Sequence, residues 1–526
     1  MLTSRSLRDL MVRVFCEEHL TSLGLAFIIL PVIYVFYNEF LRFSARVPGI
    51  GGPKGLPIVG NLWAIRKNAA EQYRLWAEKH GPVYQVSLGN IPIIVVNSAE
   101  AAKGIFGLNA QALSSRPEFY TFHKRLTGLA TTIGTASYSD SLKKRRKVAA
   151  ATLNRPGTAK YVWLLDIEIK QVMADLLEDG KAGAIAIDPM TIIQRLSLSV
   201  TTCINWGVRI PTRNAFFDEI IHIEERISSF RSTTGNLQDY VPLLRWNPFD
   251  GSAARTRDTR RRQDLYLNHL NRELADRMEK GTQMSCIQKS IITDEGKHLN
   301  QEEKSSVDLT MISGGLDTFP TTVVWLIALL AKRPDIQERA FSEIRNMYPE
   351  DQPLCHPEDD QKCVYVAALI RETLRMYSVL RLNLPRVSIR DITYDGVTYP
   401  KGTTFFINSY ACNMDEKIWP DAHIFRPERW IEQPDAPMFT YGIGYRMCAG
   451  FMLANRELYL LFMRIISCFK IQVDEDIDIH PVTGTANPKK LVSQPHRYRA
   501  KFVPRDANVL RYALDNFVPT EPDANF

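Results

Sequence analysis

The sequence predicts a mainly α-helical protein with a minor β region. Apolar residues recur at helical spacing over most of the chain, in segments 99–105, 158–177, 189–203, 216–230, 255–280, 303–332, 336–347 and 364–377. Strand-like segments are few and short; they cover 84–88, 93–96, 392–394 and 403–407, and the residues near Ile471 and Phe502. The first two flank Gly89 and Asn90, which are typical of a hairpin turn. No internal repeat divides the chain, so we expect one folding unit.

The composition is that of an ordinary globular protein, with 45% hydrophobic and 23% charged residues among 526. A net charge of +7 is mild and argues against a nucleic-acid-binding protein, which concentrates basic residues. The eight cysteines show neither paired spacing nor a zinc pattern, which indicates a reducing compartment. They are Cys16, Cys203, Cys286, Cys355, Cys363, Cys412, Cys448 and Cys468.

The N-terminal segment 1–45 contains an uncharged apolar run at about 20–37, long enough to predict one transmembrane helix. A cleaved signal peptide is the alternative. Against it, acidic residues precede the run and no small-residue cleavage site follows. Arg42 and Arg46 lie at its exit, as expected of a retained anchor whose following domain faces the cytosol.

Residues 46–61 are rich in glycine and proline and predict a stiff, turning hinge, since such a composition forms neither a regular helix nor a strand. The remaining residues, 62–526, form the predicted catalytic domain.

One cysteine, Cys448, follows a glycine-rich bend and directly precedes a helical run at 451–469. At a helix N-terminus we expect a lowered thiol pKa and a stabilised thiolate. Gly442 and Gly444 allow backbone angles closed to other residues and the close approach of a flat ligand. Arg446 is placed to pair with a carboxylate of that ligand. A single cysteine in this setting indicates a haem-thiolate iron; the alternative is a buried structural cysteine.

The stretch meets every fixed position of F-x-x-G-x-G-x-R-x-C-x-G and resembles the cytochrome P450 monooxygenases over about residues 45–505. Those positions are Phe439, Gly442, Gly444, Arg446, Cys448 and Gly450. The resemblance implies the cytochrome P450 fold after the transmembrane helix, haem b as cofactor and Cys448 as axial ligand of its iron.

A second motif lies in the long helical segment 303–332. Pro320 cannot donate a backbone hydrogen bond, so the helix is expected to open beside it. A kinked core helix is one interpretation of this pattern. With the cysteine loop, it also resembles the P450 oxygen-activation motif, which implies proton delivery by Asp317 and Thr318. The chain departs from the motif at Phe319, where P450s usually have a second threonine.

Glu372 and Arg375 are neighbours on one face of a largely apolar helix, where buried charges need partners. The P450 resemblance adds Arg429 to this structural ion network and suggests Arg386 as a ligand of a haem propionate.

A basic run at 143–147 leads into an alanine-rich helix; on charge alone it could be a solvated helix face. The resemblance implies a haem-propionate contact, for which Arg145 is the candidate, and a docking surface for an acidic electron donor. Many P450s have a tryptophan four residues before that arginine, whereas this chain has Ser141. The basic residue that faces the haem therefore stays open.

The implied reaction inserts one atom of O2 into an organic substrate, with electrons from NADPH through cytochrome P450 reductase, at the endoplasmic reticulum membrane. Several stretches are similar to the fungal phenylacetate hydroxylase group; they are 116–123, 131–135, 153–156, 193–198, 230–244 and 454–458. This implies a small monocyclic aromatic substrate. Phenols of the m-cresol or m-hydroxybenzyl alcohol type, from a polyketide toxin pathway, are an alternative.

The predicted substrate pocket consists of Phe119, Phe122, Gly315, Phe319 and Leu384, although aromatic residues at these places could equally be core packing. Two other classes of protein compete with an oxygenase. One is a haem-thiolate sensor without turnover, and the other is a membrane-anchored lipid-binding protein without haem.

Overall fold

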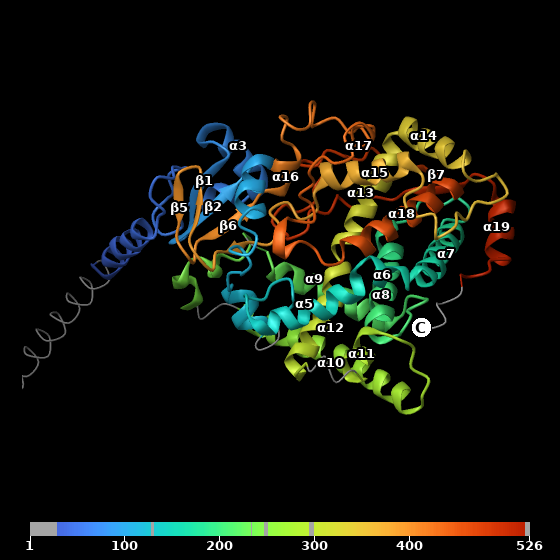
Figure 1. Cartoon of the computed structure of the whole chain (residues 1–526), viewed down its shortest axis with the longest axis horizontal. Helices are drawn as coiled ribbons and strands as arrows, with labels where there is room; N and C mark the ends of the chain where they lie inside the picture. Colours follow the sequence, from blue (N-terminus) through green and yellow to red (C-terminus); the bar gives the residue numbers. More distant parts are fainter. Residues whose placement is uncertain (1–28, 128–130, 233, 247–250, 294–298, 521–526) are drawn as a thin grey trace, which may run out of the picture.

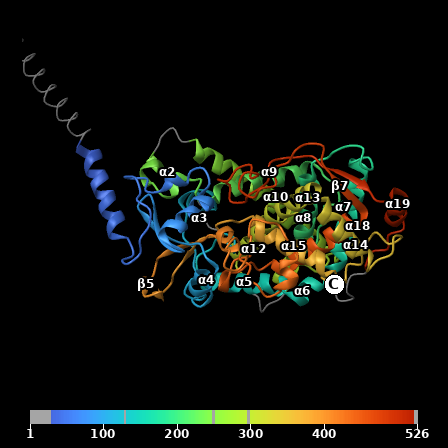
Figure 2. The same cartoon turned by 90° about the horizontal axis from the view of Figure 1, so that it is seen from above.

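The computed structural model describes residues 29–127, 131–232, 234–246, 251–293 and 299–520. This part is mainly helical, as predicted, and contains three small sheets. Helices fill most of the body, and the largest sheet lies at the end from which the helix of residues 29–44 projects (Figures 1 and 2).

The longer helices cover most of the segments that the apolar periodicity predicts. Besides the helix of residues 29–44, the helices of nine or more residues in the described part are α3 (Ala69–His80), α5 (Asp140–Leu153), α7 (Val162–Asp179), α8 (Pro189–Trp206), α9 (Ala215–Phe230), α10 (Ser252–Glu279), α12 (Gln301–Gly315), α13 (Thr318–Lys332), α14 (Pro334–Arg345), α15 (Val364–Tyr377), α18 (Phe451–Cys468) and α19 (Ala507–Asp515). The sequence prediction missed α3 and α19.

Short helices and turns connect these elements. They are α2 (Leu62–Ile65), α4 (Ala99–Ala102), α6 (Arg155–Ala159), α11 (Ile287–Thr293), α16 (Ser409–Asn413), α17 (Arg429–Glu432), the π-helices η1 (Lys103–Gly107) and η2 (Tyr120–Thr127), and the 3₁₀ turns η3 (Leu237–Asp239), η4 (Pro242–Trp246) and η6 (Gly444–Arg446). The helix predicted over 158–177 is two helices, because α6 ends at Ala159 and α7 begins at Val162.

The predicted hairpin is confirmed: β1 (Val83–Leu88) pairs antiparallel with β2 (Ile91–Val96). Strand β2 pairs in parallel with β6 (Thr404–Ile407), and β6 pairs antiparallel with β3 (Arg386–Val387). The two smaller sheets consist of β4 (Ile392–Tyr394) with β5 (Val397–Tyr399), and of β7 (Phe469–Gln472) with β8 (Lys501–Pro504). Strands β3 and β5 are too short for period-2 alternation to reveal them.

The main core lies where α13 packs against α8, α15 and α18. Nearly every residue of α13 from Phe319 to Leu330 is buried, as expected of a helix that is apolar all round. Trp325 of α13 stacks on Tyr377 of α15 with ring centroids 4.4 Å apart. This packing holds the C-terminal end of α15 against the helix that carries the second sequence motif.

The predicted opening beside Pro320 is confirmed. Helix α12 ends at Gly315 and α13 begins at Thr318, so the regular helix is interrupted at residues 316–317. The physical reason is that Pro320 has no N–H to donate to the carbonyl of Leu316.

The predicted transmembrane span at 20–37 begins outside the described residues. From residue 29 to residue 44 the chain is helical, and it exposes large apolar side chains such as Phe36 and Phe43. Within the described ranges one helical segment is long and apolar enough to cross a membrane. It is Gln301–Lys332, which comprises α12 and α13. Its most apolar window is 72% buried inside the molecule, which marks a core helix.

Candidate active site

The loop before α18 turns through two glycines in the left-handed region, as the sequence predicts. Gly442 has a φ of 74° and Gly444 a φ of 71°. The backbone N–H of Cys448 donates to Tyr441 O at 2.9 Å and closes the loop. A Cβ at position 444 would lie 2.6 Å from the carbonyl oxygen of Phe106, closer than real contacts allow. Glycine is therefore required at 444 both by conformation and by the approach of η1.

Cys448 is exposed, whereas the other six cysteines in the described part of the chain are buried. Its thiol still lies among many protein atoms, and this burial raises the pKa of Cys448. The N–H of Gly450 and the charge of Arg146 act in the opposite direction. The N–H at the start of the helix thus acts on the pKa in the expected direction, and burial of the thiol acts against it.

The three residues predicted as an ion network lie together. The fully buried carboxylate of Glu372 in α15 accepts hydrogen bonds from Arg375 Nε and Nη2, both at 2.8 Å, and from Arg429 Nε at 3.3 Å. Trp430 Nε1 and the backbone N–H of Arg426 also donate to it, at 3.1 and 3.0 Å. Five donors therefore converge on one carboxylate, which offsets the cost of burying its charge.

Hydrogen bonds continue from this network to the start of the cysteine loop. Arg375 Nη1 donates to the backbone oxygen of Asn413 at 3.0 Å. The side chain of Asn413 accepts from the N–H of Phe439 at 2.9 Å and donates to Thr440 Oγ1 at 3.0 Å. Thr440 Oγ1 in turn donates to the carbonyl of Leu374. The ion network and the cysteine loop are therefore one hydrogen-bonded unit.

Four arginines gather beside the loop: Arg116, Arg146, Arg386 and Arg446. Burial, followed by the charges of Arg146 and Arg386, lowers the pKa of Arg446 to about 9. Burial and the charge of Arg146 lower the pKa of Arg386 to about 10. Every charge that shifts the pKa of Arg116 is likewise an arginine. The positive charges in such a cluster repel one another, so an anion that binds among them is stabilised.

Arg386 gives the most direct sign that an anion belongs here. Its Nη2 donates to the backbone oxygen of Ile443 in the cysteine loop, but its Nε and Nη1 are buried without any hydrogen-bond partner in the described structure. Buried donors without partners are costly unless a ligand uses them. A haem placed by Cys448 carries two propionates, so these residues fit that group in charge and in donor chemistry.

Two neighbouring arginines of the basic run, Arg145 and Arg146, point in different directions. Arg145 points toward α12, where its Nη1 donates to Ser306 Oγ at 2.6 Å and to Thr131 O at 3.2 Å. Arg146 instead reaches the cysteine loop and donates to Met447 O at 2.7 Å. Arg146 is therefore the residue of this run that contacts the cysteine loop, and the haem-propionate contact for which Arg145 is the candidate stays a prediction.

Thr318 and Asp317 lie at the interruption between α12 and α13. Thr318 Oγ1 donates to Gly314 O at 3.1 Å and so partners a carbonyl at the end of α12. Burial raises the pKa of Asp317, partly offset by a hydrogen bond with Ser228 and by the charge of Arg231. The carboxyl group therefore binds a proton more readily than an exposed aspartate does.

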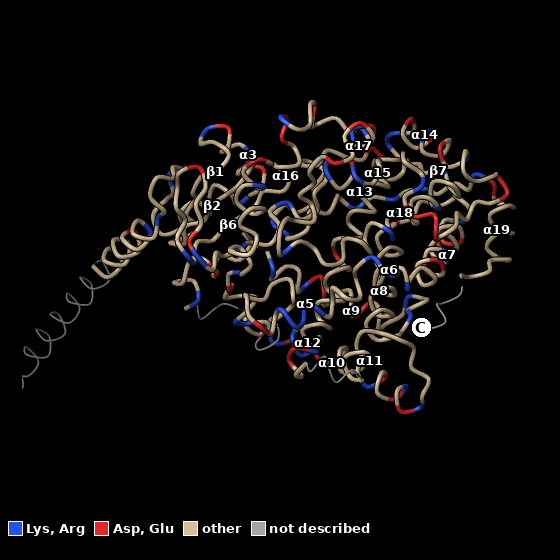
Figure 3. The backbone as a smooth tube through the Cα atoms, viewed as in Figure 1, with Lys and Arg blue, Asp and Glu red and all other residues tan. Residues whose placement is uncertain are grey.

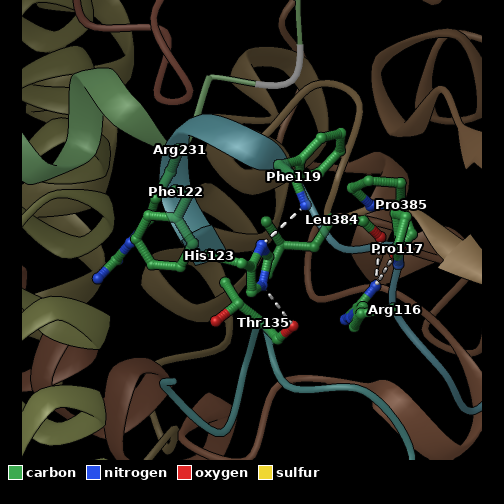
Figure 4. Close-up of a pocket in the computed structure, with 9 residues that line it drawn as sticks. All are labelled: Arg116, Pro117, Phe119, Phe122, His123, Thr135, Arg231, Leu384 and Pro385. Carbon is green, nitrogen blue, oxygen red and sulfur yellow. Dashed lines mark hydrogen bonds between the residues drawn. The ribbon is translucent and has the colours of Figure 1, made fainter. Parts of the chain in front are cut away.

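Side chains from several separate segments of the chain line a pocket (Figure 4). Its lining residues are Arg116, Pro117, Phe119, Phe122, His123, Thr135, Arg231, Leu384 and Pro385. Arg116 and Arg446 both donate to Gly134 O at 3.1 Å, so the pocket borders the arginine cluster.

Three of the five predicted pocket residues, Phe119, Phe122 and Leu384, line this pocket, and two do not. Gly315 faces α8, where a Cβ would lie 3.0 Å from Thr201 Cγ2, and Phe319 packs in the main core. Gly315 is thus a packing residue between two helices.

The fold and this site define a haem-thiolate protein, and comparison with known proteins agrees: the chain belongs to the cytochrome P450 family, whose model matches residues 50–502. It is accordingly a monooxygenase, and the family implies a haem iron.

Its relatives include two named phenylacetate-type hydroxylases of Emericella nidulans. The chain is 58% identical to 3-hydroxyphenylacetate 6-hydroxylase, over 94% of this chain and 96% of the relative. It is 37% identical to phenylacetate 2-hydroxylase, over 94% of this chain and 97% of the relative. It is also 37% identical to cytochrome P450 monooxygenase CYP3 of Mycosarcoma maydis, over 90% of this chain and 91% of the relative.

Proposed function

We propose that this monooxygenase hydroxylates the ring of a small arylacetate, such as phenylacetate or a hydroxyphenylacetate. The observation that carries the proposal is the 58% identity to 3-hydroxyphenylacetate 6-hydroxylase across nearly the whole of both chains. The kinds of residue that line the pocket agree with it, because Phe119, Phe122 and Leu384 are apolar and Arg116 and Arg231 are cationic. The cavity itself measures about 20 Å³ and must widen to admit an aromatic ring.

Cys448 would hold the haem iron through its thiolate, and Arg386, whose Nε and Nη1 have no partner in the described structure, would pair with a propionate. Arg446 and Arg146 would add positive charge beside it, while Arg446 Nη1 and Nη2 already donate to four backbone carbonyls of the protein. When bound, the haem supplies oxygen activation, which electron donation from the thiolate favours. The residues around it orient the group: the glycines at 442 and 444 let it approach the loop, and the Glu372 network keeps the loop in place.

Asp317 and Thr318 handle protons in the gap between α12 and α13. The raised pKa of Asp317 lets its carboxyl take up a proton more readily than an ordinary aspartate and release it again, as general acid–base chemistry requires. The hydroxyl of Thr318 passes protons along, because it both donates and accepts hydrogen bonds.

Electrons come from NADPH through cytochrome P450 reductase, which docks on the basic face of α5. Lys143, Lys144 and Lys147 of α5 are exposed and support this docking surface. Figure 3 marks the Lys and Arg positions along the backbone. The apolar segment at 20–37 anchors the chain in the endoplasmic reticulum membrane. Removing residues 1–45 is expected to lower the share of protein in the membrane fraction, and unchanged membrane retention would refute the anchor.

The test of function combines the purified full-length haem protein with reductase, NADPH and O2. Phenylacetate and 3-hydroxyphenylacetate are the expected substrates, and m-cresol and m-hydroxybenzyl alcohol represent the alternative phenols. We expect a substrate-induced shift of the Soret band and a product that carries one more oxygen atom on the ring for the arylacetates.

Product formation from the phenols alone would overturn the proposal in favour of the alternative. A characteristic reduced-plus-CO spectrum without any product would instead indicate a haem-thiolate sensor.

A further inference from the structure

The pocket that borders the arginine cluster combines an apolar wall with two cationic side chains. Pro117, Phe119, Phe122, Leu384 and Pro385 supply the apolar atoms. Arg116 and Arg231 supply the positive charges, from opposite sides of the pocket (Figure 4). An apolar ring and an anionic group on one small molecule would match this composition.

The donors of Arg116 are already used by the protein. Its Nε donates to Gly134 O at 3.1 Å, and its Nη1 donates to Pro385 O at 2.8 Å and to Leu384 O. Arg116 therefore holds two segments of the pocket wall together, and it would have to break these bonds in order to bind a ligand.

His123 is used in the same way. The backbone N–H of Phe119 donates to its Nδ1 at 2.9 Å, so the ring proton lies on Nε2, which donates to Thr135 O at 3.2 Å. Burial lowers the pKa of His123, which keeps the ring neutral. His123 therefore shapes the pocket and does not attract an anion.

Arg231 differs from both. It is the first residue after α9, and its guanidinium carbon lies 5.2 Å from the centre of the Phe122 ring. Its Nε is buried and has no hydrogen-bond partner within the described ranges. Burial raises the pKa values of Asp317 and Glu224, and the positive charge of Arg231 acts to lower both. Arg231 thus lies between the aromatic wall of the pocket and the α12–α13 interruption.

We propose that Arg231 binds the carboxylate of an arylacetate substrate while the substrate ring packs against Phe119 and Phe122. This inference rests on the proposed function and makes Arg231 a specificity-determining residue of the pocket. A guanidinium binds a carboxylate through two parallel hydrogen bonds, which fixes the orientation of the ring as well as its presence.

A second role for Arg231 would give different kinetics. If its charge served only to keep Asp317 ionised, its loss would lower kcat for every substrate and shift the pH profile. If it binds the substrate, its loss would raise Kd and KM for anionic substrates and leave neutral ones nearly unaffected. Phenylacetate and phenylacetamide separate these roles, because they share ring and length and differ in charge.

The experiment titrates the Soret shift and measures turnover for both compounds with the Arg231→Gln, Arg231→Lys and Arg213→Gln holoproteins. Arg213 is exposed just before α9, so its change removes the same charge outside the pocket. We expect Arg231→Gln to raise Kd for phenylacetate about 10- to 100-fold, the range of one charge-assisted hydrogen-bonded contact. Arg231→Lys should recover part of this loss, and Arg213→Gln should behave as the wild type.

An equal loss for phenylacetate and phenylacetamide, or no loss for either, would overturn the role of Arg231 while leaving the proposed function intact. Failure of the wild type to bind and oxidise any arylacetate would overturn the proposed function and the role of Arg231 with it. The reduced-plus-CO spectrum of each variant verifies that the haem protein is folded.

Discussion

The buried carboxylate of Glu372 offers the sharpest test of how this site is held. The change Glu372→Gln keeps the size of the side chain and removes its charge. Oxygen Oε1 accepts from Arg375, Arg429 and the backbone of Arg426, and Oε2 accepts from Arg375 and Trp430. Whichever oxygen becomes the amide nitrogen, at least two buried donors then face another donor.

The expected cost follows from these contacts. Glu372 and Arg375 are fully buried and Arg429 nearly so, so removal of the carboxylate leaves two guanidinium groups without their counter-charge. Breaking a buried ion pair from one side typically costs about 3–5 kcal/mol. We expect a loss of this size, together with weaker haem retention, because the network continues through Asn413 into the cysteine loop.

The matched control is Glu432→Gln. Glu432 forms a two-bond contact with Arg426 at 2.6 and 2.8 Å, but the two side chains are 51% and 45% exposed. Solvent screening makes such an exposed pair far weaker than a buried one. The two variants therefore make the same chemical change in a similar geometry and differ in burial.

The assay is urea denaturation of the purified holoproteins in detergent, followed by tryptophan fluorescence and by the Soret band. Glu372→Gln should move both midpoints to markedly lower urea, and Glu432→Gln should barely move them. Similar midpoints for the two variants would refute the reasoning that burial decides the strength of these contacts.

Three further predictions follow from the site. Arg386→Ala should lower haem retention during dialysis against apomyoglobin, because a buried guanidinium with two unpartnered donors is lost, and retention equal to the wild type would contradict its role. Arg390→Ala, at an exposed arginine four residues further on, is the control. Thr318→Ala should keep the haem spectrum, while a smaller share of the NADPH oxidised should appear as product and a larger share as peroxide. An unchanged ratio of product to NADPH oxidised would show that the hydroxyl of Thr318 is dispensable. Burial raises the pKa of Glu457 to about 8, and its Oε1 has no hydrogen-bond partner among the residues that the structure describes. The unfolded chain ionises from about pH 4.5, so the folded state loses stability as the pH rises from about 4.5 to 8. Glu457→Gln imitates the protonated form and should be more stable than the wild type by a margin that grows over this range; a margin independent of pH would refute it.

Much of the site could be predicted because its determinants are local. Gly442 and Gly444 take backbone angles that few other residues allow, and Cys448 follows them at a set spacing. Glu372 and Arg375 face each other because residues three apart are neighbours on a helix. The break between α12 and α13 follows from the missing N–H of Pro320.

The sequence left open how the neighbouring basic residues of α5 are oriented. Arg145 and Arg146 are adjacent in α5 and equally basic, yet their side chains point about 100° apart around the helix axis. Burial of Leu142 and Ala149 sets the rotation of α5 and turns Arg146 toward the loop. Arg116 lay in a stretch similar to phenylacetate hydroxylases, but no local signal marked it as part of an arginine cluster.

The sequence by itself determined the class of the protein, the glycine-rich loop that presents Cys448 and the helix that opens beside Thr318, because bond geometry and hydrogen bonding act within a few residues. Tertiary structure alone decided that Arg146 meets Met447 across 301 positions, and that Arg231 lies beside Phe122 at the pocket. Contacts between residues so far apart in sequence depend on how the buried faces of distant helices pack together. The spacing of residues along the chain does not reveal that packing.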